Sequence, residues 1–127
     1  MMTRIKIDTH TGKRDVDALE VRRPFAIHYG VSDMDGYLTV SHLGTGRALS
    51  WFRPDAMDMA RLYLDECVAL AAKYPEAFKK RSMMAFRGVR QSDPSLRDAL
   101  LALRDKARAM GGYTEALTPS WAERVKG

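Results

Sequence analysis

Hydrophobic and polar residues alternate along most of the first half of the chain. Ile5 and Ile7 alternate with charged residues, and after Pro24 every odd position is apolar, namely Phe25, Ile27, Tyr29 and Val31. Successive side chains of a strand point to opposite faces, so this period of two predicts strands over residues 4–8 and 18–31. Proline cannot donate a ladder hydrogen bond, and Pro24 therefore predicts a bend or break in the second run.

Residues 37–52 are predicted to form a β-hairpin that turns around Gly44-Thr45-Gly46. A three-residue loop would place Val40 with Ala48 and Ser50, whereas a two-residue loop gathers the large apolar side chains on one face. We expect this second register. The first face then carries Leu38, Val40, Leu49 and Trp51, with His42 near the turn. The reverse face carries Tyr37, Thr39, Ser41, Ala48, Ser50 and Phe52.

The apolar period lengthens to that of a helix after the hairpin. A first helix is predicted from Pro54-Asp55 to Tyr74, followed by one further turn over residues 76–81. Its inner face carries Ala56, Ala60, Tyr63, Cys67, Leu70 and Tyr74 and is widened by Met59 and Leu62. A second helix is predicted to begin at Asp93 and Pro94 and to stop at Gly111-Gly112, with an apolar stripe of Leu96, Ala99, Leu100, Leu103, Ala107 and Met110. Residues 82–89 fit either a short strand or a packed connector.

These elements predict an α+β fold over a single domain, residues 1–127. A mostly antiparallel sheet of three to five strands from the N-terminal half would be packed by two amphipathic helices from the C-terminal half. The first helix should cover the hairpin face that carries Leu38, Val40, Leu49 and Trp51.

The composition favours a soluble cytoplasmic protein without a membrane partner. Cys67 is the one cysteine of the chain, which excludes an internal disulfide and fits a reducing compartment. No run approaches the roughly 18 apolar residues that a membrane-spanning helix needs, and the N-terminus has no signal-peptide core.

The net charge of +5 is concentrated in one stretch. The five basic residues between positions 79 and 90 equal the whole excess (21 − 16 = 5), namely Lys79, Lys80, Arg81, Arg87 and Arg90. Such a stretch favours an anionic partner, of which nucleic acid is the commonest large one. A solvated basic face without a partner is the other interpretation.

No catalytic, metal-binding or cofactor motif is present. The three histidines, His10, His28 and His42, do not form an i,i+4 pair, and Cys67 belongs to no ligand motif. We therefore predict no metal and no cofactor. An enzyme acting on a small anionic substrate would need His28 or His42 to converge with arginine in one pocket.

The reverse face of the hairpin supports the functional hypothesis. Aromatic platforms beside basic groups bind single-stranded nucleic acid, because bases stack and phosphates need counter-charge. Tyr37 and Phe52 would stack on bases, and the phosphate contacts would come from Arg47, Arg53, Lys79, Lys80, Arg81 and Arg87. We predict a small, non-enzymatic, homo-oligomeric nucleic-acid-binding protein. The alternative is an assembly module whose second face is a subunit interface, with no nucleic-acid binding.

The order of hairpin and helix over residues 37–74 is similar to that of several small nucleic-acid-binding modules. These include the arm-binding domains of tyrosine recombinases and the single-strand-binding coactivators. The resemblance concerns the order of elements alone, so it implies nucleic-acid binding as a class and assigns no functional residue.

Overall fold

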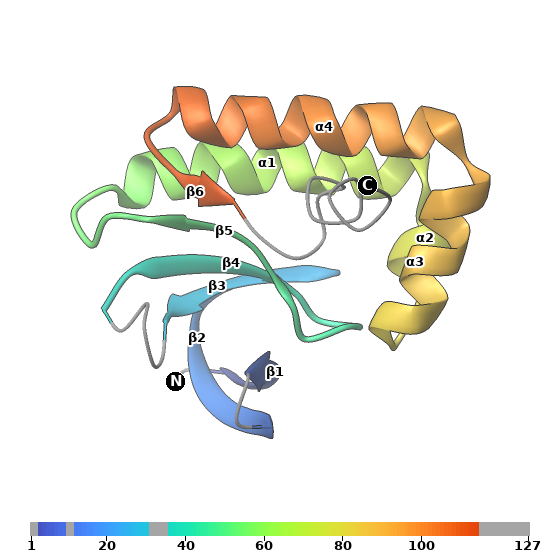
Figure 1. Ribbon diagram of the computed structural model, residues 1–127. Coiled ribbons are helices and arrows are strands. Elements are labelled where there is room, and N and C mark those ends of the chain that lie inside the picture. The colour runs from blue at the N-terminus through green and yellow to red at the C-terminus, as the bar shows by residue number, and fades with distance from the viewer. Residues whose placement is uncertain (1–2, 10–11, 31–35, 115–127) are drawn as a thin grey trace.

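The computed structural model describes residues 3–9, 12–30 and 36–114. In this part of the chain a six-stranded antiparallel sheet lies below four helices (Figure 1). The strands are β1 (Thr3–Thr9), β2 (Gly12–Arg22), β3 (Phe25–Tyr29), β4 (Leu38–His42), β5 (Ala48–Phe52) and β6 (Tyr113–Thr114). The predicted α+β class is confirmed. His10 and the predicted strand residue Val31 lie outside the described residues.

The strands follow one another in space as they do in sequence, from β1 to β6. Neighbouring strands joined by short turns pair most readily, which explains the meander of β1 to β5. The predicted break at Pro24 is the turn between β2 and β3. β6 is the exception, because it returns from the C-terminal half of the chain to pair with β5.

The four helices are α1 (Met57–Lys73), α2 (Pro75–Phe78), α3 (Met83–Ser92) and α4 (Pro94–Ala109). The predicted start of the first helix was too early, because Pro54 and Asp55 form a turn before α1. The undecided stretch after residue 82 is the helix α3, whose Ser82 side chain accepts a hydrogen bond from the Ala85 N–H. A helix is favoured there because the buried residues Phe86 and Arg90 are four positions apart.

The main core lies between the helices and one face of the sheet. Figure 1 shows α1 and α4 side by side above the strands, with α2 and α3 at one end. The largest fully buried apolar side chains come from both layers, namely Phe25, Ile27, Leu38, Leu49, Phe52, Tyr63, Leu64, Phe86, Leu96 and Leu100. Burial of each apolar face against the other layer is the main stabilising contribution.

The register of the β4–β5 hairpin changes at a β-bulge. Near the turn Ser41 pairs with Ala48, as the two-residue-loop register requires, but Val40 already pairs with Ser50. Leu49 is the extra residue on β5 and remains fully buried. A shift of one residue exchanges the two faces of a strand.

Beyond the bulge the predicted faces of β5 are therefore wrong. Leu38 pairs with Phe52, and both side chains lie in the core under the helices. Trp51 pairs with Thr39 and belongs to the opposite face. The predictions for Leu38, Val40 and Leu49 are confirmed, whereas those for Ser50, Trp51 and Phe52 are reversed.

A second, smaller apolar cluster lies on the sheet face away from the helices. It consists of Ile5, Ile7, Ala18 and Ala26. β2 is long and irregular near Ala18, so that β1 turns back below the sheet (Figure 1). The Asp8 N–H donates to the Gly46 carbonyl oxygen at 2.8 Å, which joins β1 to the β4–β5 turn. The β1–β2 hairpin thus covers part of this face.

The start of α4 provides a direct test of helix capping. The Asp93 side chain accepts a hydrogen bond from the Leu96 N–H at 3.2 Å. Asp93→Ala is expected to lower the free energy of unfolding by about 1 kcal/mol, because it leaves that donor without its cap. Asp93→Asn keeps an acceptor and should stay near wild type in the same urea titration. Equal losses in the two variants would contradict a capping role.

Candidate nucleic-acid interface

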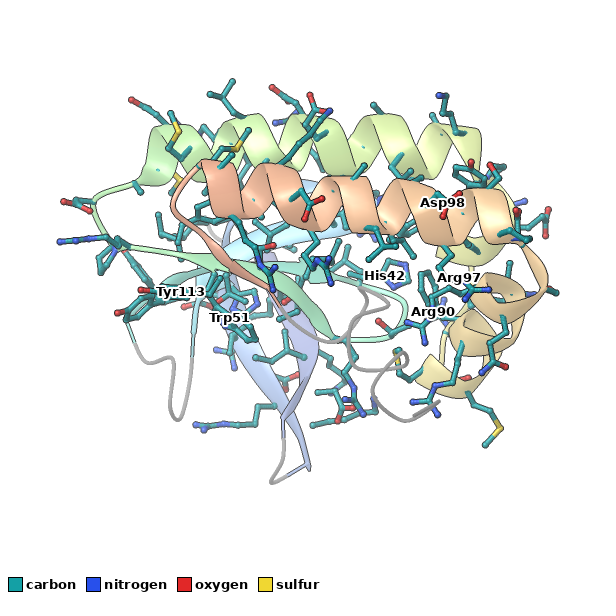
Figure 2. All side chains as sticks on the ribbon, turned by 45° about the horizontal axis from the view of Figure 1, so that its top comes forward. His42, Trp51, Arg90, Arg97, Asp98 and Tyr113 are labelled. Carbon is teal, nitrogen blue, oxygen red and sulfur yellow. The ribbon has the colours of Figure 1, made fainter. Side chains whose placement is uncertain are left out.

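Three aromatic side chains meet where β4, β5 and β6 lie together. Trp51 pairs with Tyr113 across β5 and β6, and the rings of Tyr37 and Tyr113 contact each other with centroids 6.1 Å apart. Tyr113 is 55% exposed, and Tyr37 and Trp51 are half-buried. Figure 2 shows Trp51 and Tyr113 next to each other below α4. We call Tyr37, Trp51 and Tyr113 the aromatic patch.

Only one of the two predicted stacking residues belongs to this patch. Tyr37 does, but Phe52 is 0% exposed and packs against Tyr63 at 5.5 Å between ring centroids. The bulge brings Trp51 to the face where Phe52 was expected. Tyr113 was not predicted, because no local pattern indicates that the residues after Gly112 return to the sheet.

The two arginines predicted at the ends of the hairpin differ in their surroundings. Arg53, two residues after Trp51, is largely exposed and lies 3.7 Å from Asp55. Arg47 is half-buried, and its Nε lies 2.8 Å from a carboxylate oxygen of Asp8. Arg53 therefore has the more accessible positive charge, whereas Arg47 helps to hold β1 against the β4–β5 turn.

The predicted basic stretch lies at the other end of the sheet. Lys79, Lys80 and Arg81 connect α2 to α3, and Lys79 lies 3.5 Å from Glu76. Gly44 packs directly on the Lys80 carbonyl oxygen, and a side chain at Gly44 would overlap it. Figure 1 shows the β4–β5 turn extending toward α2 and α3. Arg81 and Arg87 are exposed.

Three arginines lie together where α3 meets α4. Arg90 of α3 is only 1% exposed, and Arg97 of α4 is half-buried. Burial lowers the pKa of Arg90, and the charges of Arg87 and Arg97 lower it further. Figure 2 shows Arg90 and Arg97 adjacent. We call Arg87, Arg90 and Arg97 the arginine cluster. Arg97 was missed because it lies outside the basic stretch of the sequence.

His28 is buried in the sheet with both ring nitrogens hydrogen-bonded. Its Nδ1 donates to the Tyr29 carbonyl oxygen at 2.8 Å, and its Nε2 accepts from the Ser41 hydroxyl at 2.8 Å. Burial lowers the pKa of His28, and the bond to Tyr29 offsets part of that effect. The ring is a neutral structural group without a nitrogen left for a substrate.

His42 joins the β4–β5 turn to α2. Its Nε2 donates to the Phe78 carbonyl oxygen at 2.8 Å, and its Nδ1 faces the Thr45 hydroxyl at 3.0 Å. The ring packs among Phe25, Phe78 and Phe86. Burial lowers the pKa of His42, again partly offset by the bond to a backbone carbonyl. Both of its ring nitrogens are therefore already engaged.

Other chemistry has little support in the described part of the chain. Among its residues no three histidine, cysteine or acidic side chains could jointly hold a metal ion. Cys67 is fully buried, and burial raises the pKa of its thiol far above the ordinary range, which disfavours a reactive thiolate. No described helix has the length and apolar character needed to cross a membrane.

Comparisons of the chain with protein-family models, with curated proteins and with solved structures found no match. The arrangement of side chains is therefore the basis for any functional conclusion.

Proposed function

We propose that this protein binds single-stranded nucleic acid without catalysing a reaction. The observation that carries the proposal is the aromatic patch, in which Trp51 and Tyr113 pair across β5 and β6, Tyr37 just before β4 contacts the Tyr113 ring, and Tyr113 is more than half exposed. Flat rings on a sheet bind bases of any sequence, because every base has a face that can stack. Bases inside a duplex are already stacked, so a patch of this kind favours a single strand.

Positive charge at both ends of the β4–β5 hairpin supports the same proposal. Arg53 follows the aromatic patch on β5, while Arg81 and Arg87 lie beyond the opposite end. The four residue steps from Arg47 to Trp51 span roughly 13 Å at the usual rise per residue of a strand. A strand of a few nucleotides along the hairpin would reach basic groups on both sides of the stacked bases. The lone cysteine of the chain supports a cytoplasmic location.

A protein–protein interface is the competing role for this patch. Exposed tyrosine and tryptophan are also enriched where subunits meet. The net charge of +5 favours an anionic partner such as nucleic acid at this patch. The two roles predict different solution behaviour.

Binding is expected to quench the fluorescence of Trp51. A Trp121→Phe background leaves Trp51 as the single tryptophan, so the signal reports stacking at the patch. A titration with single-stranded oligonucleotides should show quenching, with an affinity that falls linearly with salt on logarithmic axes. Tyr113→Ala should weaken binding by roughly tenfold or more, since one stacked base contributes about 1–3 kcal/mol.

Tyr29 offers a matched control for the Tyr113 variant. Tyr29 is 51% exposed against 55% for Tyr113, but it lies on β3 and is not part of the aromatic patch. Tyr29→Ala should leave the affinity within about twofold of wild type. In binding free energy, a twofold change is less than half of the roughly 1.4 kcal/mol that corresponds to a tenfold change. No binding at low salt, together with a stable oligomer in light scattering, would instead support the assembly role.

A further inference from the structure

We infer that the preferred substrate is a nucleic acid in which a duplex continues into a single strand. The inference rests on the proposed function, because the aromatic patch takes the unpaired bases. The duplex lies at the opposite end of the sheet, against three basic side chains of the β2–β3 turn and the α2–α3 connection, namely Arg23, Lys80 and Arg81. We call these three residues the basic end.

Backbone contacts through the β4–β5 turn bring the two segments of the basic end together. The Pro24 carbonyl oxygen, next to Arg23, accepts a hydrogen bond from the Leu43 N–H at 2.8 Å. The following residue, Gly44, packs on the Lys80 carbonyl oxygen so closely that a Cβ at Gly44 would lie 2.2 Å from it. The basic end is therefore one surface, although its residues are far apart in the sequence.

The charges of the basic end are in excess over the acidic side chains around it. Arg23 and Arg81 are exposed, Lys80 is half-buried, and none of the three forms an ion pair with a described residue. The acidic residues near these segments are each matched by a base. Glu76 lies 3.5 Å from Lys79, and the remaining pairs join Asp8 to Arg47, Glu20 to Arg22 and Arg61, and Asp65 to Arg22.

The basic end is suited to the backbone of a duplex. Among the described residues at this end the aromatic rings are buried, namely those of Phe25, Phe78 and Phe86. Such a surface contacts phosphates and leaves the bases directed away from the protein, as they are inside a duplex. Phosphate charge is also denser along a duplex, at one charge per roughly 1.7 Å of axis, so a basic surface gains more from a duplex than from one strand.

The sheet face between the basic end and the aromatic patch does not continue the stacking surface. Thr39 and Ser41 of β4 share the face of Trp51, and both are buried. The roughly 13 Å from Arg47 to Trp51 corresponds to about four base-pair steps of 3.4 Å. One nucleic acid can therefore place duplex backbone at the basic end and unpaired bases on the aromatic patch.

The experiment compares three probes, each prepared as DNA and as RNA. These are a single strand, a blunt duplex, and the same duplex carrying the single strand as a 5′ or 3′ overhang. For the wild-type protein, fluorescence anisotropy should show the better overhang duplex binding about tenfold or more tightly than either the single strand or the blunt duplex. Two linked contacts act together in the overhang duplex, whereas each of the other probes offers one.

Single substitutions test the basic end through the ratio of overhang-duplex affinity to single-strand affinity. Arg23→Gln and Arg81→Gln, in different segments, should each lower this ratio by about fivefold, the upper range for one exposed charged contact. Arg108→Gln is the matched control, because it removes the same charge in the last turn of α4. Its ratio should stay within about twofold of wild type, and equal melting temperatures would show that the fold is retained.

The outcomes separate this substrate from the proposed function. If single strands bind but an overhang adds nothing to either the strand or the blunt duplex, the junction substrate is wrong and the proposed function stands. The same conclusion follows if the three glutamine variants have equal ratios. If the blunt duplex binds and single strands do not, the proposed function fails and the junction fails with it. No binding of any probe overturns both.

Discussion

Replacing Phe52 with alanine is expected to lower the free energy of unfolding by about 3–5 kcal/mol, the usual cost of removing a buried phenylalanine. Phe52 is 0% exposed, contacts the Tyr63 ring and packs against Gly112 after α4. The neighbouring backbone cannot collapse fully into the space, so a cavity would add to the lost burial. Urea unfolding followed by far-UV circular dichroism measures the loss.

Trp51→Ala is the matched comparison, because Trp51 is the adjacent aromatic residue on the other face of β5. Its side chain is partly exposed and lies outside the main core, so its removal leaves no closed cavity and we expect a smaller loss than for Phe52→Ala. The register without a bulge predicts the opposite order, with Trp51 in the core. A larger loss for Trp51→Ala than for Phe52→Ala would therefore contradict the bulge at Leu49.

Acidification below pH 6.5 is expected to destabilise the protein through its two buried histidines. Burial lowers the pKa of His28 and His42 below the ordinary value of 6.5. The unfolded chain then binds more protons than the folded protein once the pH falls below that value, so protons favour unfolding. The two neutral histidines contribute their full stabilisation above pH 6.5. The free energy of unfolding then declines as the pH falls toward the folded-state pKa values of these histidines. The slope can reach about 1.4 kcal/mol per pH unit for each histidine.

The pH profile of the double variant His28→Gln and His42→Gln tests this origin. Glutamine can form some of the same hydrogen bonds but does not titrate. The variant should be less stable than wild type at neutral pH, because ring packing around His42 is lost, and its stability should change less between about pH 5 and 7. Parallel profiles for the variant and wild type would show that other groups cause the pH dependence.

Local signals in the sequence were reliable where structure depends on neighbouring residues. The Asp93 cap, the stop at Gly111 and the turn at Pro24 each follow from the chemistry of one or two residues, and each is present in the structure. The predicted inner face of α1 was largely correct, since Ala60, Tyr63, Cys67 and Leu70 are buried, because helical spacing determines which side chains share a side. Leu62 was wrongly placed on that face, because it is 49% exposed, and the buried Leu64 and Ala71 were not predicted.

The candidate site was only partly predictable, because it joins residues that are far apart in the sequence. Tyr37 and the basic stretch could be found from sequence, but the aromatic patch also needs Trp51 and Tyr113. Tyr113 reaches the patch only because α4 returns the chain to β5. The arginine cluster similarly joins α3 with α4, and Arg97 has no distinguishing pattern of its own.

The sequence alone determined that this chain forms strands first and helices afterwards, since apolar periodicity and capping residues act over a few positions. It also determined the charge excess and its concentration in one stretch. Tertiary structure alone decided which face of β5 is buried. A bulge at Leu49 allows both Leu49 and Phe52 to enter the core, and the packing of these large side chains against the helices outweighs regular alternation. That long-range packing leaves Trp51, and not Phe52, at the surface beside Tyr37.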